Sequence, residues 1–209
     1  MEFDFETLGK KDRYKLLCAI VAPRPIALVT SISENGDRNV APMSFFNVFG
    51  DAPPIVILGI QSRPNGSPKD TVENIRATGE FVVNSVDSAV AEAMVATSIE
   101  FPPDVDEAEM VGFGYEPSIK VRPGRIREAP AAMECRVERI VDYHNRAIVF
   151  GEVIQMHVRD NCIDPANLHI DNRTYQPLAR LHGDFYVASD QQFELPKPTY
   201  EQWMAQHEP

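Results

Sequence analysis

Two segments of the chain carry the side chains best suited to chemistry. Residues 38–46 bring small, hydroxyl, amide, thioether and aromatic side chains into one predicted strand. Such a surface suits a flat ligand, although the same aromatic rings could equally fill the core of a β-barrel. The second segment sets Ser62, Arg63, Lys69 and Thr71 around a predicted helix start. Free backbone N–H groups and the positive end of the helix dipole favour an anion there, and a phosphate would suit the site.

The predicted helix begins with Ser67 as its N-cap and Pro68 as its first residue, with Asp70 three residues after the cap. Gly79 is expected to end it, because a glycine readily adopts the left-handed conformation after a helix. A well-capped helix explains all of these residues without a ligand. It does not explain Lys69, whose positive charge is mildly unfavourable in a first turn. An anion that Lys69 helps to hold is the better explanation.

A hairpin is predicted to position the first segment. Two runs of strand-forming residues, 26–33 and 38–46, flank a polar turn at residues 34–37. Within this turn, Asn35-Gly36 is the pair that most often supplies two residues with positive φ. The sequence therefore predicts a tight turn between two antiparallel strands.

Three further features predict how the strands are arranged, one within the hairpin and two after it. Pro42 lacks the N–H that a sheet ladder requires, so it should lie at an edge or a bulge. Residues 55–60 form a short apolar run, typical of a strand buried on both faces at the centre of a sheet. Residues 131–141 alternate, which predicts one core face and one water face, with Glu134 on the water face.

Helices and the remaining strands complete a mainly β protein with flanking helices. Helices are predicted within residues 7–21, 67–79 and 88–97, and strands at 80–86, at 147–158 with a bulge at Gly151, and before residue 187. Residues 100–116, which include Pro102-Pro103 and six acidic residues, are interpreted as an exposed loop, with a lid over a site as the alternative. The pattern favours a single antiparallel β-barrel with helices at its ends. It forms one domain over residues 1–209, with a tail from about residue 190.

Composition excludes several classes of function. The 209 residues are 44% hydrophobic and 24% charged, without an apolar run near the roughly 20 residues that span a bilayer. The acidic, mixed N-terminus is unlike a secretory signal, so a cytoplasmic location is expected. Three widely separated cysteines and five histidines show no metal-ligand spacing, so neither disulfides nor a metal site is expected. The net charge of −11, without a basic block, argues against nucleic acid or an anionic membrane as a partner.

Several motifs together resemble the flavin reductase-like family, whose members have the FMN-binding split β-barrel fold. The motifs are PRPIALVTS, NVAPMSFFN, a double proline before an apolar strand, KDTVENI and GEFVVNSV, with a later HGDFY segment similar to a strand that closes the barrel. The similarity covers about residues 20–90, whereas residues 100–128 do not match the common pattern.

The resemblance implies a homodimer with one FMN per protomer near the subunit interface, and hydride transfer from NADH or NADPH to the flavin. The cofactor-binding residues that it implies are Arg24, Thr30, Ser31, Asn39, Ala41, Pro42, Met43, Ser44, Phe45, Phe46, Ser62, Lys69, Asp70 and Thr71. The cofactor carries out this chemistry itself, so no catalytic side chain is assigned and no triad or paired carboxylates are required. His144 and His182 could orient a nicotinamide or a substrate, but a solvated loop histidine is the commoner case.

Three functions follow in order of preference. The first is an FMN-dependent NAD(P)H oxidoreductase that supplies reduced flavin to a partner such as a flavin-dependent monooxygenase or another electron acceptor. The second is a flavoredoxin-like FMN electron carrier without substantial NAD(P)H activity. The third is a split-barrel protein that binds a flat ligand without redox turnover. The preferred nucleotide, the physiological partner, and the choice between FMN and FAD remain open.

Overall fold

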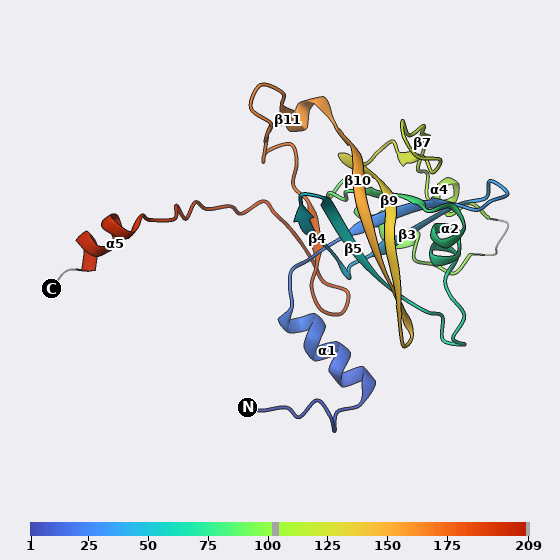
Figure 1. Cartoon of the computed structure of the whole chain (residues 1–209), viewed down its shortest axis with the longest axis horizontal. Helices are drawn as coiled ribbons and strands as arrows, with labels where there is room; N and C mark the ends of the chain where they lie inside the picture. The colour runs from blue at the N-terminus through green and yellow to red at the C-terminus, as the bar shows by residue number, and fades with distance from the viewer. Residues whose placement is uncertain (102–104, 208–209) are drawn as a thin grey trace.

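The computed structural model describes residues 1–101 and 105–207, and its centre is a seven-stranded antiparallel sheet (Figure 1). The strand order is β3-β2-β6-β9-β10-β5-β4. The strands are β2 (Ala27–Ile32), β3 (Arg38–Met43), β4 (Phe46–Asp51), β5 (Pro54–Gln61), β6 (Glu80–Asn84), β9 (Ala131–Tyr143) and β10 (Arg146–Val158). The fold is mainly β with flanking helices, as the sequence predicts.

Short elements surround this sheet. The helices are α1 (Lys10–Ile20), α2 (Asp70–Thr78), α3 (Ala91–Ala96), α4 (Glu107–Met110) and α5 (Tyr200–His207), with a 3-10 turn η1 at Asp160–Cys162. The minor strands are β1 (Arg24–Pro25), β7 (Tyr115–Glu116), β8 (Arg125–Ile126), β11 (Ile163–Asp164), β12 (His169–Ile170), β13 (Leu178–Arg180) and β14 (Tyr186–Ala188). The strand β1 pairs with β13, which pairs with β14, so the start and end of the domain share one small sheet.

The sheet must roll up because its two edges are consecutive in the chain. Only Ser44 and Phe45 separate β3 from β4, yet these strands lie at opposite edges. Two linking residues span at most about 11 Å, so the edges are held next to each other. At this seam the Gly59 N–H donates to the Phe45 carbonyl at 2.8 Å. No ladder joins β3 to β4 in the described part of the chain, so the barrel is open along this line.

The main core lies inside the rolled sheet and is closed at one end by α2. Leu58 of β5, Phe81 of β6 and Val149 of β10 are fully buried there, with Ile75 of α2 packed against them. Alternation along β5 explains the arrangement, because its even-numbered residues from Val56 to Ile60 point inward. The strand is next to the edge of the sheet and only its inner face is buried. The predicted central, doubly buried position was therefore wrong.

The hairpin between β2 and β3 forms as predicted, but with a different turn. Among the described residues of the turn only Gly36 has positive φ, at 99°. The Ser33 N–H donates to the Asp37 carbonyl at 2.8 Å, and the Gly36 N–H donates back to the Ser33 carbonyl. A turn that ends in a left-handed glycine suits such a wider loop, so Asn35 need not be left-handed. The second strand also ends at Met43, not at residue 46, and a new strand begins at Phe46.

The start of α2 lies later than predicted. Asn65 Oδ1 accepts hydrogen bonds from both the N–H and the hydroxyl of Ser67, and the Ser67 carbonyl accepts the Arg63 N–H at 2.8 Å. Ser67 therefore forms part of the turn before the helix and does not cap the helix. Lys69 is the N-cap, with extended backbone and no side-chain cap, and Asp70 is the first helical residue. Gly79 ends the helix with φ of 69°, as predicted.

Two other predicted features differ in the structure. Glu134 is fully buried, because residues 117–124 cover the face of β9 that was expected to meet water. The acidic loop at 100–116 contains α4, whose Ala108 is buried in a second core cluster. Pro102-Pro103 lies outside the described residues.

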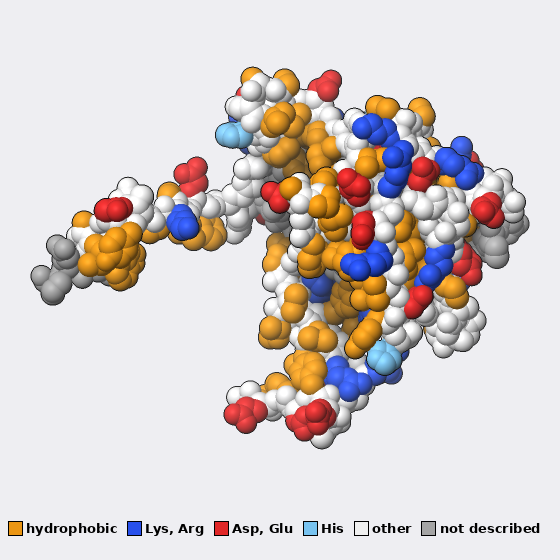
Figure 2. Space-filling model, in the orientation of Figure 1, with side chains coloured by type: hydrophobic (Ala, Val, Ile, Leu, Met, Phe, Trp, Pro, Cys, Tyr) orange, Lys and Arg blue, Asp and Glu red, His pale blue; other side chains and the backbone are white. Residues whose placement is uncertain are grey.

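Both ends of the chain reach away from the sheet. Figure 1 shows α1 and the long tail with α5 projecting from its body, and Figure 2 shows hydrophobic side chains along both. Ile20 on α1 is 80% exposed and Leu195 in the tail is 82% exposed. In the part of the chain that the structure describes, none of the helices has the length and apolar character needed to cross a membrane.

Candidate functional site

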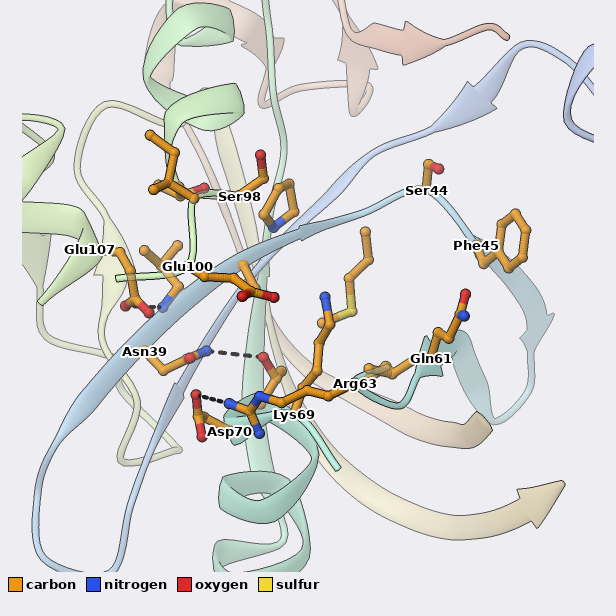
Figure 3. A pocket seen from close by; sticks show the side chains of 18 of the residues that line it. Asn39, Ser44, Phe45, Gln61, Arg63, Lys69, Asp70, Ser98, Glu100 and Glu107 are labelled. Atoms are coloured by element: carbon orange, nitrogen blue, oxygen red, sulfur yellow. Dashed lines mark hydrogen bonds and ion pairs between the residues drawn. The ribbon is translucent and has the colours of Figure 1, made fainter. Parts of the chain in front are cut away.

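A cleft of about 620 Å³ opens beside the seam, between β3, β5, the start of α2 and the segment after α3 (Figure 3). It gathers most of the predicted site residues from three separate parts of the chain. Those that line it are Asn39, Ala41, Pro42, Met43, Ser44, Phe45, Lys69, Asp70 and Thr71. The structure thus brings the two chemically distinctive segments into one cavity.

One end of the cleft is suited to an anion. The backbone N–H groups of Asp70 and Thr71 open α2 and have no hydrogen-bond partner among the described residues. The ammonium of Lys69 points into the cleft and likewise has no partner in the described chain. Arg63 lies beside them, where its guanidinium pairs with Asp70 at 2.6 Å. That hydrogen bond raises the pKa of Arg63, so the group is a permanent cation.

The other end of the cleft is aromatic. The guanidinium carbon of Arg146 lies 4.6 Å from the centre of the Phe45 ring, and the Tyr14 ring lies 6.3 Å from the same ring. Burial lowers the pKa of Arg146, and burial, followed by a hydrogen bond with Cys18, raises that of Tyr14. At neutral pH the arginine therefore remains charged and the phenol remains neutral. Met43 and Pro42 add apolar surface nearby.

A buried polar network fixes the cleft between these ends. Asn39 Nδ2 donates to the Thr71 hydroxyl at 3.0 Å and to the Ser31 hydroxyl at 3.4 Å. Asn74 of α2 donates to the same Ser31 hydroxyl at 3.2 Å. Ser31 therefore does not line the cleft but joins β2, β3 and α2 behind it. The network sets the position of the helix start relative to the strand.

Four other predicted residues lie away from the cleft. Arg24 is buried and donates to the carbonyls of Cys18 and Leu181, at 2.5 and 2.7 Å, so it ties α1 to the end of the domain. It does not line the cleft, but its Nε also donates to the hydroxyl of the cleft-lining Ser44 at 3.4 Å. Thr30 donates to the Gly124 carbonyl at 2.6 Å, on the other side of β2. Phe46 packs against the main core and Ser62 follows β5 without lining the cavity. Their predicted contacts with the cofactor stay predictions that nothing in the cleft supports.

The two loop histidines also lie elsewhere. The His144 ring packs edge-on against Tyr143 at the β9–β10 turn, with ring centres 4.6 Å apart. His182 makes a similar contact with Phe185, at 5.3 Å. Neither lines the cleft.

Several lining residues were absent from the predicted set. Asn65 and Ser67 stand in the turn before α2, where the polar composition was a usable signal, whereas Arg63 beside them was predicted as part of the anion site. Tyr14 and Arg146 reach the cleft only because α1 and the start of β10 lie against Phe45. No local pattern reports such a long-range contact.

An acidic flank closes the cleft opposite the helix start. It is formed by Glu100, after α3, and by Glu107 of α4 (Figure 3). Glu107 Oε2 accepts the Val40 N–H at 3.3 Å, and partial burial raises the pKa of this carboxyl. The segment interpreted as a loop or lid thus contributes a wall of the cleft.

Comparison with known proteins identifies the family of this chain. The family model described as flavin reductase like domain matches residues 21–179. The crystal structure of the 2-nitrobenzoate 2-nitroreductase NbaA of Pseudomonas fluorescens is 37% identical, with a TM-score of 0.88 over 96% of this chain and 98% of that chain. Nitrilotriacetate monooxygenase component B from Bacillus cereus is 31% identical, with a TM-score of 0.87 over 93% and 98% of the two chains.

A third comparison concerns the fold alone. A structure from Shewanella frigidimarina whose description names a split barrel domain is 23% identical, with a TM-score of 0.82 over 95% of this chain and 100% of that chain. The open seam between β3 and β4 is what such a description implies. With the family model covering most of the sequence, the chain belongs to the flavin reductase-like domain family and has its split-barrel fold.

Proposed function

We propose that this protein binds FMN in the cleft and acts as an NAD(P)H-dependent flavin oxidoreductase. The observation that carries the proposal is Lys69, which points into the cleft beside two backbone N–H groups and, like them, has no partner among the described residues. A lysine at a helix start works against the helix dipole unless an anion compensates for it. The FMN phosphate meets this requirement, and the family is a flavin-binding one.

The rest of the cleft fits the other parts of the cofactor. The wall of Met43, Phe45 and Tyr14 offers apolar and aromatic surface to the isoalloxazine ring. Asn39 and Thr71 lie between this wall and the helix start, where hydroxyl-bearing ribityl carbons would pass. Arg146 stands over Phe45 and adds a positive charge near the ring. We take FMN as the cofactor because its terminal phosphate monoester suits the free backbone N–H groups and the lysine at the helix start.

Bound flavin supplies hydride acceptance from a nicotinamide and onward electron transfer, so the protein need not provide a reactive side chain. The tasks left to this chain are binding, orientation and exclusion of water. The polar network of Ser31, Asn39 and Asn74 holds the helix start, and the flank with Glu107 narrows access from the opposite side.

The named relatives support an onward electron acceptor. One is a nitroreductase of 2-nitrobenzoate and another is a component of a nitrilotriacetate monooxygenase. We infer from the second that this protein supplies reduced flavin to a flavin-dependent monooxygenase. We also place the cofactor near the interface of a homodimer, to which the projecting ends of the chain contribute.

The test is anaerobic reduction of the purified protein reconstituted with FMN. Addition of NADH or NADPH should bleach the absorbance of the oxidised flavin rapidly, with one of the two nucleotides preferred. A flavin that bleaches only with dithionite or a protein reductant would instead indicate the electron carrier. Reconstituted material that retains no flavin after desalting would rule out both functions.

A further inference from the structure

A second cleft, of about 520 Å³, lies at the opposite end of the long β9–β10 hairpin. Arg146, at the start of β10, lines the first cleft, whereas His157 and Val158, at its end, line the second. Thirteen residues of strand separate these ends, a path of roughly 40 Å. The two clefts share no lining residue, so within one protomer a molecule in the second cleft would meet different side chains from one in the first.

The second cleft concentrates arginine in a strongly acidic protein. Arg125, Arg127 and Arg159 line it, against the carboxylates of Glu116 and Asp160. Glu116 is shared, since it lies 3.1 Å from the guanidinium of Arg125 and 4.0 Å from that of Arg127. Arg159 donates only to the main-chain carbonyl of Glu128, at 2.8 Å, and pairs with no carboxylate in the described chain. Guanidinium donors therefore remain available.

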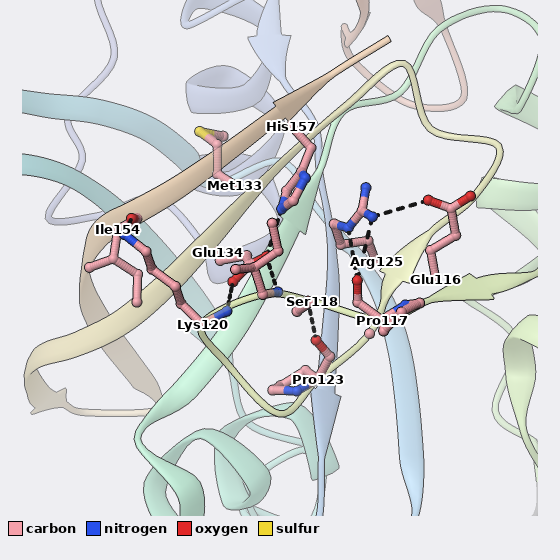
Figure 4. A network of polar contacts seen from close by, with 12 residues as sticks. Glu116, Pro117, Ser118, Lys120, Pro123, Arg125, Met133, Glu134, Ile154 and His157 are labelled. Carbon is pink, nitrogen blue, oxygen red and sulfur yellow. Dashed lines mark hydrogen bonds and ion pairs between the residues drawn. The ribbon is translucent and has the colours of Figure 1, made fainter.

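The floor of the cleft holds an oriented histidine (Figure 4). His157 Nε2 lies 2.6 Å from Glu134 Oε1, and the fully buried Glu134 also accepts the N–H groups of Ile119 and Lys120, at 2.7 and 2.6 Å. Burial alone would raise the pKa of Glu134, but these hydrogen bonds outweigh it and lower the pKa. The carboxylate is thus ionised at neutral pH and only accepts. His157 must carry its proton on Nε2.

This arrangement leaves the other ring nitrogen of His157 for a ligand. Among the described residues Nδ1 has no hydrogen-bond partner, and the side chain is 17% exposed at a position that lines the cleft. The rigid support from Glu134 fixes the direction of the ring. Three arginines and one fixed imidazole then face a volume in the usual range for small-molecule sites, about 300 to 1,000 Å³.

We propose that this second cleft binds a small phosphate-bearing molecule, with Arg125, Arg127 and Arg159 as its counter-charges and His157 Nδ1 as a directed hydrogen-bonding group. Guanidinium forks match the paired oxygens of a phosphate, and several of them favour a ligand with more than one negative charge. Nδ1 of His157 accepts from a donor on the ligand when the imidazole is neutral and donates to a phosphate oxygen when it is protonated. This site is independent of the flavin cleft and of the redox function.

Calorimetric titration of the full chain, loaded with FMN, with inorganic pyrophosphate tests the proposal. We expect one site per chain, and a roughly ten- to hundred-fold weaker Kd in the double variant Arg127→Gln/Arg159→Gln. The matched control is Arg139→Gln/Arg173→Gln, which removes the same charge from exposed arginines outside both clefts and should change Kd less than about twofold. Circular dichroism checks that both variants are folded.

Two further measurements test where the ligand binds and which chemical class of ligand the second cleft recognises. Pyrophosphate should shift the Nδ1 resonance of His157 in nitrogen NMR spectra while leaving the visible spectrum of the flavin unchanged. Citrate should bind at least about tenfold more weakly than pyrophosphate if phosphate is the group recognised. No binding at millimolar pyrophosphate, equal losses in both double variants, an unmoved His157 resonance, or equal affinity for citrate would each overturn the proposal.

Discussion

At the scale of single residues, the proposed flavin cleft depends on a hydroxyl that does not line it. Ser31 accepts from both Asn39 and Asn74, and Asn74 Nδ2 has no other partner among the described residues. Ser31→Ala should therefore leave a buried donor unpaired and cost about 1 to 3 kcal/mol in the free energy of unfolding. Urea denaturation measures this.

The control for that variant is Ser62→Ala, because Ser62 makes no side-chain hydrogen bond in the described structure and does not line the cleft. It should be neutral for stability. A Ser31→Ala protein as stable as the Ser62→Ala protein would show that the network does not support the fold.

Glu134 provides a residue-scale prediction with a pH dependence. Its pKa is lower in the folded protein than in the unfolded chain, where it is about 4.3. Its contribution to stability is therefore complete above that value and is lost as the pH falls through the lower folded-state pKa. Glu134→Gln should lose about 3 kcal/mol at pH 7, because the buried donors around it lose their anion.

Urea denaturation between about pH 3 and pH 7 checks the sign of this effect. The wild type should lose stability below about pH 4.3 more steeply than Glu134→Gln, so that the two curves converge in acid. Parallel curves over this range would contradict the role of the ionised carboxylate.

At the scale of elements, local sequence patterns predicted whether a segment forms a helix, a strand or a turn better than they predicted its position in the fold. The hairpin, the end of α2 at Gly79 and the long strands were predicted from turn chemistry and alternation. The position of β5 in the sheet was not predicted correctly, because an apolar run indicates that a strand is buried but not which strands lie beside it. The start of α2 was predicted too early, because Ser67 bonds to Asn65 in the preceding turn and does not cap the helix. A sequence motif alone does not show which of these two local arrangements the serine adopts.

Gly151 on β10 allows an element-scale prediction. A methyl group on its Cα would lie 2.3 Å from Cζ of the fully buried Phe81 ring, so the ring or the strand must move. Gly151→Ala should destabilise the protein by about 1 to 3 kcal/mol. The control Gly9→Ala meets nothing closer than 3.8 Å and should be nearly neutral. Equal melting temperatures for the two variants would show that this strand crossing is loosely packed.

At the scale of the whole molecule, the prominent feature is the apolar surface on both projecting ends. Ile20 on α1 and Phe193, Leu195 and Tyr200 in the tail are 73–82% exposed in the single chain. Such surface is usually covered by a partner, and a second copy is the simplest one. No pattern within one sequence reveals that contact, so the homodimer rests on the family resemblance and on this surface.

Light scattering at micromolar concentration should give twice the chain mass of 23.4 kDa. Removal of residues 196–209 should weaken the dimer, seen as a mass that falls toward the monomer on dilution, because the tail contributes apolar contact area. A monomeric full-length chain would contradict the dimer, and an unchanged dimer after truncation would assign the interface to other surfaces.

The most direct test of the proposed cofactor site is a comparison of FMN and riboflavin on apoprotein carrying Lys69→Ala. Lys69 is the N-cap of α2 and points into the cleft, so its loss should remove a charge-assisted hydrogen bond to the phosphate. Fluorescence titration should show FMN affinity about ten- to hundred-fold weaker and riboflavin affinity unchanged, with Lys197→Ala in the exposed tail matching the wild type for both ligands. FMN affinity that is unchanged in Lys69→Ala, or lost equally for both flavins, would contradict the placement of the phosphate at this helix start.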